Sequence, residues 1–110
     1  MTIIVETLDL GGAGPRVVVK DTIDVAGTAT RASSHALEQA PLAERHADVV
    51  NQLLANGARL TGKVSLHELA FGTTGINHYT GTAANPRFAG RIPGGSSSGS
   101  AAAVAAGLVD

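Results

Sequence analysis

The residue types with the most chemical potential lie in a run of glycines and serines at residues 93–100, which continues into an alanine-rich segment. Such a run alone fits a flexible linker about as well as a functional site. A linker separates two folded units, however, whereas this run leads directly into an expected helix. A backbone nest at the N-terminus of that helix is therefore the favoured interpretation.

Two familiar glycine-rich sites do not fit this run. A phosphate-binding loop of the Walker type needs a lysine after its last glycine, and here an alanine follows Gly99 and Ser100. A Gly-x-Ser-x-Gly nucleophile elbow would need residues 95–99 to lie between a strand and a helix. The preceding residues, Ile92 and Pro93, form a poor strand, which excludes the elbow.

Four segments, in the same order along the chain, resemble the amidase signature family. They cover nearly everything from Val17 to the end of the chain, so chance agreement is a poor explanation. The segments are residues 18–27 (VVKDTIDVAG), residues 62–72 (GKVSLHELAFG), Asn85-Pro86, and residues 94–108 (GGSSSGSAAAVAAGL).

The resemblance implies a Ser–Ser–Lys triad with two members in this chain. The family's catalytic lysine falls on Lys20, and its bridging serine, which has a cis peptide bond, falls on Ser96. A lysine must be neutral to act as a base, and burial beside the valine strand favours the neutral form. In the family the nucleophilic serine lies in a second glycine-rich block, which we expect beyond Asp110. We therefore expect a proton relay here without the attacking group, with the side chains of Lys20 and Ser96 at hydrogen-bond distance, about 2.6–3.2 Å.

The resemblance also implies that Ala70, Gly72 and Thr73 contribute to the substrate site, although a purely structural loop is about equally expected there. Lys63 follows a strand much as Lys20 does, but family position favours Lys20, which leaves Lys63 structural or exposed. The remaining polar residues have simpler interpretations as helix caps and loop hydrogen-bond donors (Ser97, Ser98 and Ser100) or as acceptors for turn amides (Asp21 and Asp24).

The elements that must position these residues form an α/β pattern. We predict strands at residues 2–5, 16–20 and 58–63, and a helix from Pro41 through Leu54, on which His46 is expected as a partly buried imidazole with its hydrogen bonds satisfied. The apolar face of this helix is expected to consist of Leu42, His46, Val49, Val50, Leu53 and Leu54. Strand, crossover and strand then build a parallel or mixed sheet. Further predictions are one helical turn within residues 28–37, a short helical stretch at residues 65–71, a loop at residues 72–100 and a helix at residues 100–108. The resemblance implies part of the amidase signature fold, a mixed sheet flanked by helices that is incomplete in this chain.

Composition limits the remaining possibilities. A chain of 110 residues with 44% hydrophobic residues can bury one modest core, so residues 1–110 are expected to be the amino-terminal part of a single amidase signature domain. Eight Lys and Arg against nine Asp and Glu give no basic stripe, which argues against a direct nucleic-acid partner. The absence of Cys and the scattered positions of the four His argue against a metal site. No cofactor is expected.

The absence of Cys makes a reducing, cytoplasmic setting the default expectation. No signal peptide or membrane span is expected. The leading functional hypothesis is hydrolysis of a small-molecule carboxylic amide through an acyl-enzyme by the complete protein. The alternative within the family is the transamidating subunit of a glutamine-dependent aminoacyl-tRNA amidotransferase. Homo-oligomerisation or partner subunits are both compatible with the sequence. A non-catalytic remnant or binding module is the hypothesis from a different class.

Overall fold

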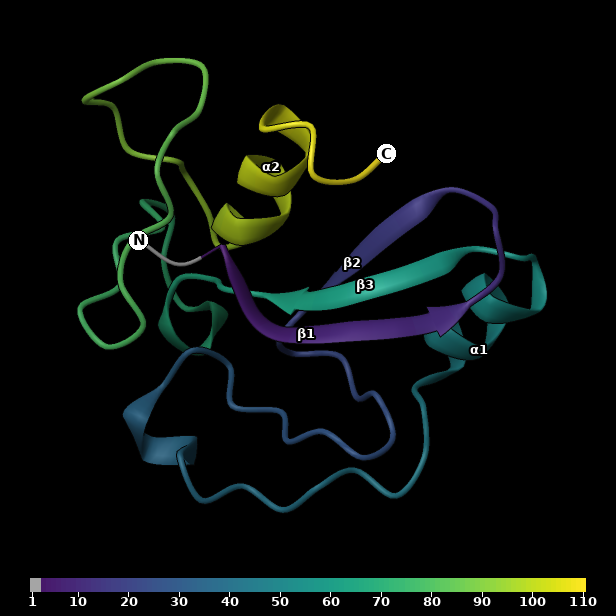
Figure 1. Cartoon of the computed structure of the whole chain (residues 1–110). Coiled ribbons are helices and arrows are strands. Elements are labelled where there is room, and N and C mark those ends of the chain that lie inside the picture. Colours follow the sequence, from purple (N-terminus) through teal and green to yellow (C-terminus); the bar gives the residue numbers. More distant parts are fainter. Residues whose placement is uncertain (1–2) are drawn as a thin grey trace.

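A computed structural model describes residues 3–110 of the chain. Within that range the chain forms three strands, two α-helices and two short 3₁₀ turns (Figure 1). The strands are β1 (Ile4–Gly11), β2 (Arg16–Lys20) and β3 (Arg59–Val64), and the helices are α1 (Asp48–Ala55) and α2 (Ser98–Ala105). The 3₁₀ turns are His35–Leu37 and Glu68–Ala70. Thr2, the first residue of the strand predicted at residues 2–5, lies outside the described residues.

β3 is the central strand of a mixed sheet with the order β1-β3-β2. β1 runs antiparallel to β3, whereas β2 runs parallel to it. A parallel pair needs a crossover, and the chain between β2 and β3 supplies it by passing under one side of the sheet and through α1 (Figure 1). The predicted strand–crossover–strand unit is therefore confirmed, and the fold is α/β with a mixed sheet flanked by helices.

The two faces of the sheet carry separate hydrophobic clusters. On one face Val19 and Leu60 pack with Val50 of α1. On the other face Val64 packs with Ala103 of α2. α1 and α2 are thus held against the sheet by apolar contacts from opposite sides.

Alternation along β2 decides which way Lys20 points. Val18 belongs to the cluster on the α2 face, and Val19 belongs to the cluster on the α1 face. Consecutive strand residues point to opposite faces, so Lys20 points with Val18 towards α2. The valines are covered from both sides, as the sequence predicted, although only Val19 is fully buried.

The first helix is shorter than the sequence predicted. α1 begins at Asp48 rather than at Pro41, and Leu42 and Val49 are exposed rather than buried. Residues 41–47 are not helical, because Ala43 bonds to a neighbouring segment. Its carbonyl accepts from the Gly27 N–H at 2.9 Å, and its own N–H donates to the Thr28 carbonyl at 2.8 Å. These tertiary bonds replace the ones that a helix would have made.

His46 therefore precedes α1 and does not lie on its apolar face. It is half-buried, and its Nδ1 accepts a hydrogen bond from the backbone N–H of Ala26 at 3.0 Å. The expectation of a partly buried imidazole with a satisfied ring is confirmed, but through a loop contact.

The other predicted helical segments lie where the sequence predicted them, but their first and last residues differ. The stretch predicted at residues 65–71 forms only the Glu68–Ala70 turn, within which Leu69 and Ala70 take left-handed φ angles of 55° and 57°. The turn predicted within residues 28–37 is His35–Leu37. α2 begins at Ser98 rather than Ser100, and it ends before Gly107, whose φ is 72°.

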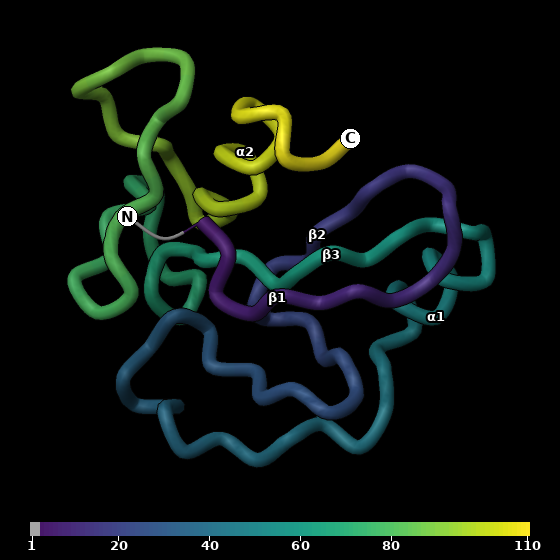
Figure 2. The backbone as a smooth tube through the Cα atoms, viewed as in Figure 1, coloured from purple at the N-terminus to yellow at the C-terminus, as the bar shows by residue number. Residues whose placement is uncertain are grey.

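The long loop predicted before α2 is present, and the backbone between Ala70 and Ser98 winds irregularly at one end of the sheet (Figure 2). The buried side chain of Asn77 organises part of it. Its amide donates to the carbonyls of Ser33 at 2.8 Å and Leu66 at 3.1 Å, and its oxygen accepts from two backbone N–H groups of the loop. A loop without regular structure is thus fixed by side-chain bonds to its backbone.

Two contacts tie α2 to the sheet. Gly99 donates its N–H to the Ser65 carbonyl at 3.0 Å, and a Cβ at residue 99 would collide with the backbone of Ser65. Beyond the helix, the guanidinium of Arg16 donates to a carboxylate oxygen of Asp110 at 3.1 Å. That hydrogen bond holds the pKa of Asp110 below its ordinary value. Both ends of α2 are therefore anchored.

Over residues 3–110 no helix has the length and apolar character needed to cross a membrane.

Candidate active site

Lys20 and Ser96 meet where β2 ends and the loop enters α2. The Nζ of Lys20 lies 2.6 Å from the Oγ of Ser96, and both side chains are half-buried. The contact brings together residues 76 positions apart in the sequence. Its length is that of a direct hydrogen bond, as the sequence predicted for a lysine and serine that share a proton.

The backbone of Ser96 is held through its carbonyl oxygen. The peptide bond between Gly95 and Ser96 is cis. The Ser96 carbonyl accepts from the N–H groups of His67 at 2.9 Å and Ser98 at 3.0 Å. Ser96 is therefore a fixed point between the loop and the first turn of α2.

Ser97 is a second partner of the same lysine. Its Oγ lies 3.0 Å from the Nζ of Lys20. Ser97 occupies the N-cap position of α2, but its side chain makes no capping hydrogen bond. The interpretation of Ser97 as a helix cap was wrong, because the hydroxyl faces the lysine instead.

A cavity of about 260 Å³ adjoins the serines. Of the described residues, those lining it are Pro93, Gly94, Gly95, Ser96, Ser97 and Ala101. The lining thus offers two hydroxyls, both already in contact with Lys20, and no third nucleophilic side chain.

The residues predicted to bind substrate lie on the neighbouring loop. Ala70 and Thr73 are exposed, and Gly72 is half-buried under the ring of His67. Their loop is joined to the serine loop by a hydrogen bond from Gly94 N–H to the Thr74 carbonyl, 3.1 Å long. None of the three lines the cavity beside Ser96, so their part in substrate binding stays a prediction.

Lys63 is neither exposed nor near the serines. Its side chain is fully buried, and its Nζ lies 2.8 Å from a carboxylate oxygen of Asp21. It also donates to the Ala29 carbonyl at 3.2 Å and to the Thr30 hydroxyl at 3.0 Å. The structural interpretation of Lys63 is confirmed, and its alternative as an exposed side chain was wrong.

Asp21 follows Lys20 but points to the opposite face of the sheet. It accepts from the backbone N–H of Arg31 at 3.3 Å, as predicted for a residue that bonds turn amides, and its main partner is the Lys63 ammonium. Asp24 accepts from the hydroxyl of Thr30 at 2.6 Å rather than from a turn amide. A buried lysine almost always has a charged partner. This rule is the signal by which sequence reasoning could have searched for an acidic partner of Lys63 and found Asp21.

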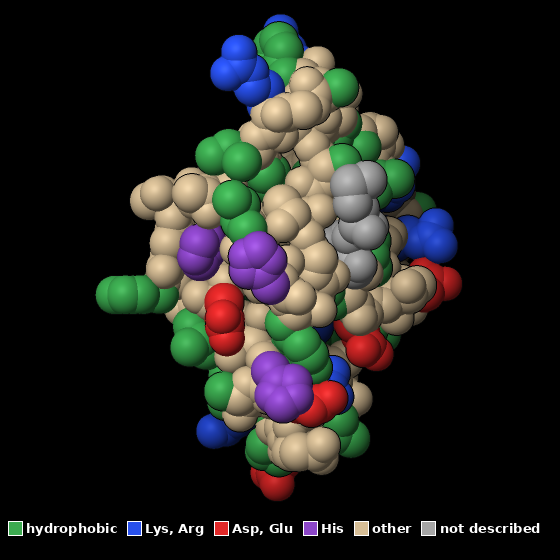
Figure 3. Space-filling view, turned by 90° about the vertical axis from the view of Figure 1, so that its left-hand side faces the viewer, with side chains coloured by type: hydrophobic (Ala, Val, Ile, Leu, Met, Phe, Trp, Pro, Cys, Tyr) green, Lys and Arg blue, Asp and Glu red, His purple; other side chains and the backbone are tan. Residues whose placement is uncertain are grey.

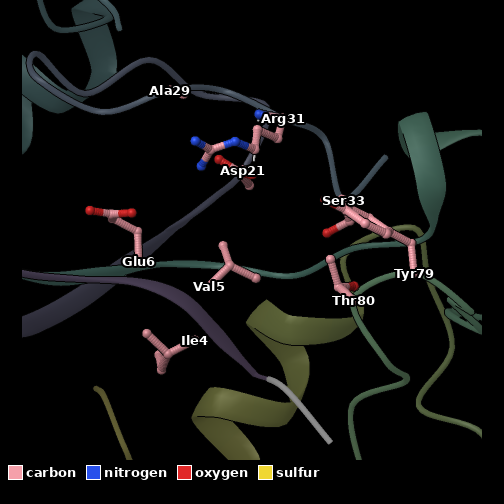
Figure 4. A pocket seen from close by; sticks show the side chains of 9 residues that line it. All are labelled: Ile4, Val5, Glu6, Asp21, Ala29, Arg31, Ser33, Tyr79 and Thr80. Atoms are coloured by element: carbon pink, nitrogen blue, oxygen red, sulfur yellow. Dashed lines mark hydrogen bonds between the residues drawn. The ribbon is translucent and has the colours of Figure 1, made fainter. Parts of the chain in front are cut away.

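A separate cavity of about 290 Å³ opens beside this ion pair (Figure 4). Glu6 of β1, Asp21 and Arg31 supply its charged groups, and Tyr79 and Thr80 approach it from the long loop (Figure 4). Lys20 and Ser96 are not among its lining residues. The Lys20–Ser96 contact and the charged group of Glu6, Asp21 and Arg31 therefore occupy different places in the fold.

Histidines gather on the face formed by the long loop (Figure 3). His35, His67 and His78 line one open depression there together with Glu68. Across residues 3–110, no group of three His, Cys, Asp or Glu side chains is arranged to hold a metal ion. The Nε2 of His35 lies 3.3 Å from a carboxylate oxygen of Glu38. The Nδ1 of the half-buried His67 accepts the backbone N–H of Gly75, a role that its sequence context did not indicate.

The chain is similar in sequence to enzymes that act on amides. It is 47% identical over 92 residues to a fatty acid amide hydrolase of Arabidopsis thaliana, covering 84% of this chain and 15% of that protein. It is 46% identical over 95 residues to a glutamyl-tRNA(Gln) amidotransferase subunit of Koribacter versatilis, covering 86% of this chain and 20% of the relative.

The fold is similar to that of solved relatives. The structure of a 6-aminohexanoate cyclic dimer hydrolase superposes with a TM-score of 0.86 at 29% identity, over 97% of this chain and 25% of the other. The chain thus spans between 15% and 25% of the length of these three relatives. The sequence pattern of the amidase family matches residues 13–110. The chain therefore belongs to the amidase signature family, as its four sequence blocks predicted.

Proposed function

We propose that the complete protein hydrolyses a carboxylic amide through an acyl-enzyme, and that this chain supplies two members of its Ser–Ser–Lys triad. Lys20 is the general base and Ser96 is the bridging serine. The observation that carries the proposal is the 2.6 Å contact between the Lys20 Nζ and the Ser96 Oγ, next to a cavity open to a substrate. Family membership supports the same assignment.

The Nζ of Lys20 contacts two serine hydroxyls. An ammonium group has three donors and no acceptor, whereas a neutral amine can donate to one hydroxyl and accept from another. In the structure the Nζ of Lys20 donates to both hydroxyl oxygens, that of Ser96 at 2.6 Å and that of Ser97 at 3.0 Å. Once Lys20 has given up a proton, donation to Ser97 would leave its lone pair for the hydroxyl proton of Ser96. In this arrangement Ser97 orients the amine, and Ser96 passes the proton.

The relay would work in both directions. Ser96 gives its proton to Lys20 and takes the hydroxyl proton of the nucleophilic serine, whose oxygen then attacks the amide carbonyl carbon. When the carbon–nitrogen bond breaks, the proton returns through Ser96 to the leaving amine. Water then attacks the acyl ester by the same route, which releases the carboxylic acid and restores the serine.

The nucleophile and the amides that stabilise the oxyanion are proposed to lie beyond Asp110 in the complete protein. The described residues at the cavity offer no third hydroxyl, and relatives of this chain are four to seven times its matched length. Residues 1–110 would then be the amino-terminal part of one catalytic domain. Ala70, Gly72 and Thr73 are proposed to contact the substrate from the neighbouring loop.

Transamidation is the second candidate, because the similarity to a tRNA-dependent amidotransferase, at 46% identity, is about as strong as that to an amide hydrolase. Both functions use the same relay and differ in the fate of the released ammonia or amine: hydrolysis sets it free, whereas transamidation passes ammonia from glutamine to an activated acyl group on transfer RNA. Purification of the complete protein under mild conditions separates them: stable partner subunits favour transamidation, and a single-component enzyme that releases free acid favours hydrolysis.

Covalent labelling tests the proposal. The complete protein, as its gene encodes it, is treated with a serine-directed fluorophosphonate, and the labelled peptide is identified by mass spectrometry. We expect one labelled serine beyond residue 110 and loss of amide hydrolysis in parallel with labelling. Label on Ser96 itself, or an unlabelled protein that hydrolyses no amide, would contradict the proposed arrangement.

A further inference from the structure

We propose that His67 is a positioning residue that fixes Ser96 for the proton relay through a hydrogen-bond acceptor at its Nδ1. This inference rests on the proposed function and adds a residue from outside the triad. It starts from His67, a half-buried residue whose main chain bonds to one loop and whose ring bonds to another. One loop carries Ser96, and the other passes through Thr74 and Gly75.

The main chain of His67 holds Ser96 directly. Its N–H donates to the Ser96 carbonyl at 2.9 Å. Any residue except proline could make this bond, so it does not explain a histidine. It does place the His67 side chain beside the loop that enters α2.

The side chain makes the contact that depends on residue type. The backbone N–H of Gly75 donates to Nδ1 of His67 at 3.2 Å. Because that N–H must donate, Nδ1 carries no proton and the neutral ring has its proton on Nε2. The ring lies against Gly72, where a Cβ would collide with it, so its orientation is fixed from both sides.

Gly75 in turn packs closely against the loop that carries Ser96. A Cβ at residue 75 would collide with the Gly94 carbonyl and would come within 2.8 Å of the Ser98 Cβ. The carbonyl of the neighbouring Thr74 accepts from the Gly94 N–H at 3.1 Å. The backbone around Gly75 is therefore packed against the residues on both sides of Ser96, and the position of Gly75 depends on Nδ1.

Loss of the acceptor would leave the Gly75 N–H without its partner and let both loops shift. A displacement of about 1 Å at a reacting group can lower a rate by about 100-fold. The effect should fall on kcat, since His67 does not line the cavity beside Ser96. Substrate affinity should change little.

Two substitutions of nearly equal shape isolate the acceptor. In His67→Asn the Oδ1 takes the place of Nδ1 and can accept from Gly75, whereas His67→Leu has a methyl group there. In the complete protein we expect His67→Asn to keep kcat within about threefold of the unmodified enzyme. We expect His67→Leu to lower kcat by about 10- to 100-fold, with KM within about threefold. Equal kcat values for the two variants would overturn the proposal.

A third variant covers a failure of His67→Leu to fold. His67→Gln keeps a polar side chain but moves the acceptor outward to the place of Nε2, so its kcat should fall like that of His67→Leu. A His67→Gln enzyme as active as His67→Asn would overturn the role of Nδ1.

Amide hydrogen exchange gives a readout that needs no activity. Residues 72–76 and 93–97 should stay protected in His67→Asn and exchange faster in His67→Gln. If the unmodified protein hydrolyses no amide, the proposed function fails, and this exchange comparison alone decides the role of His67. Equal exchange in the two variants would contradict it.

Discussion

The Nζ of Lys20 and the Oγ of Ser96 lie 2.6 Å apart, although their residues are 76 positions apart in the sequence. Lys20 comes from the end of a strand whose alternation turns it towards α2. Ser96 comes from the loop that enters that helix, and its carbonyl is held by His67 and Ser98. Both partners are thus fixed by the fold before any substrate binds.

The two serines beside Lys20 should differ in importance. In the complete protein, Ser96→Ala removes the only hydroxyl proposed to pass the proton, so kcat should fall by about 10²–10⁴-fold. Ser97→Ala removes only a contact that orients the amine, and we expect a loss of less than about tenfold. Steady-state kinetics on one amide substrate compares them. An enzyme that depends more on Ser97 than on Ser96 would show that the roles are reversed.

The buried Lys63–Asp21 pair should support stability rather than chemistry. Lys63→Met leaves the Asp21 carboxylate buried without its counter-ion, which should lower the free energy of unfolding by about 3–5 kcal/mol. The matched control is Arg59→Met on the same strand, where an exposed pair with Asp9 is worth about 0–1 kcal/mol.

Urea unfolding of the complete protein measures both effects. The double variant Lys63→Met with Asp21→Leu should regain a substantial part of the loss, since it leaves no unpaired charge. Equal losses for Lys63→Met and Arg59→Met would show that the buried pair contributes no more than a surface pair.

The 110-residue chain by itself should be inactive. It contains the proposed base and bridging serine, but a relay without an attacking oxygen has nothing to activate. We expect no amide hydrolysis and no covalent label from a fluorophosphonate, with the complete protein as the positive control. Turnover by the short chain would identify a nucleophile within these residues and would refute the proposed division of the triad.

Local sequence patterns predicted the elements that hold Lys20 and Ser96. Three consecutive valines predicted β2, and the segment at residues 58–63, directly after the first helix, predicted β3. The alanine-rich segment after the serines predicted α2 to within a few residues. The order of the family blocks then identified Lys20 and Ser96 as partners, and their predicted contact distance is confirmed.

The features that sequence reasoning missed depend on contacts between distant segments. The apolar spacing after Pro41 suits a helix, but backbone bonds between Ala43 and residues 27–28 hold that part of the chain in a non-helical conformation. Asp21 and Lys63 come into contact only when β2 and β3 pair in parallel. Similarly, the acceptor role of His67 depends on a fold that brings Gly75 back to its ring. No local pattern encodes these pairings.

Replacement of Lys20 tests the central claim most directly. In the complete protein, Lys20→Ala should lower kcat/KM for amide hydrolysis by at least about 10²–10⁴-fold, because the relay loses its base. Its thermal unfolding midpoint should stay close to that of the unmodified enzyme, since the half-buried lysine has no ion pair to lose among the residues described. A Lys20→Ala enzyme with near-normal turnover would contradict the account, as would a loss of activity that only follows unfolding.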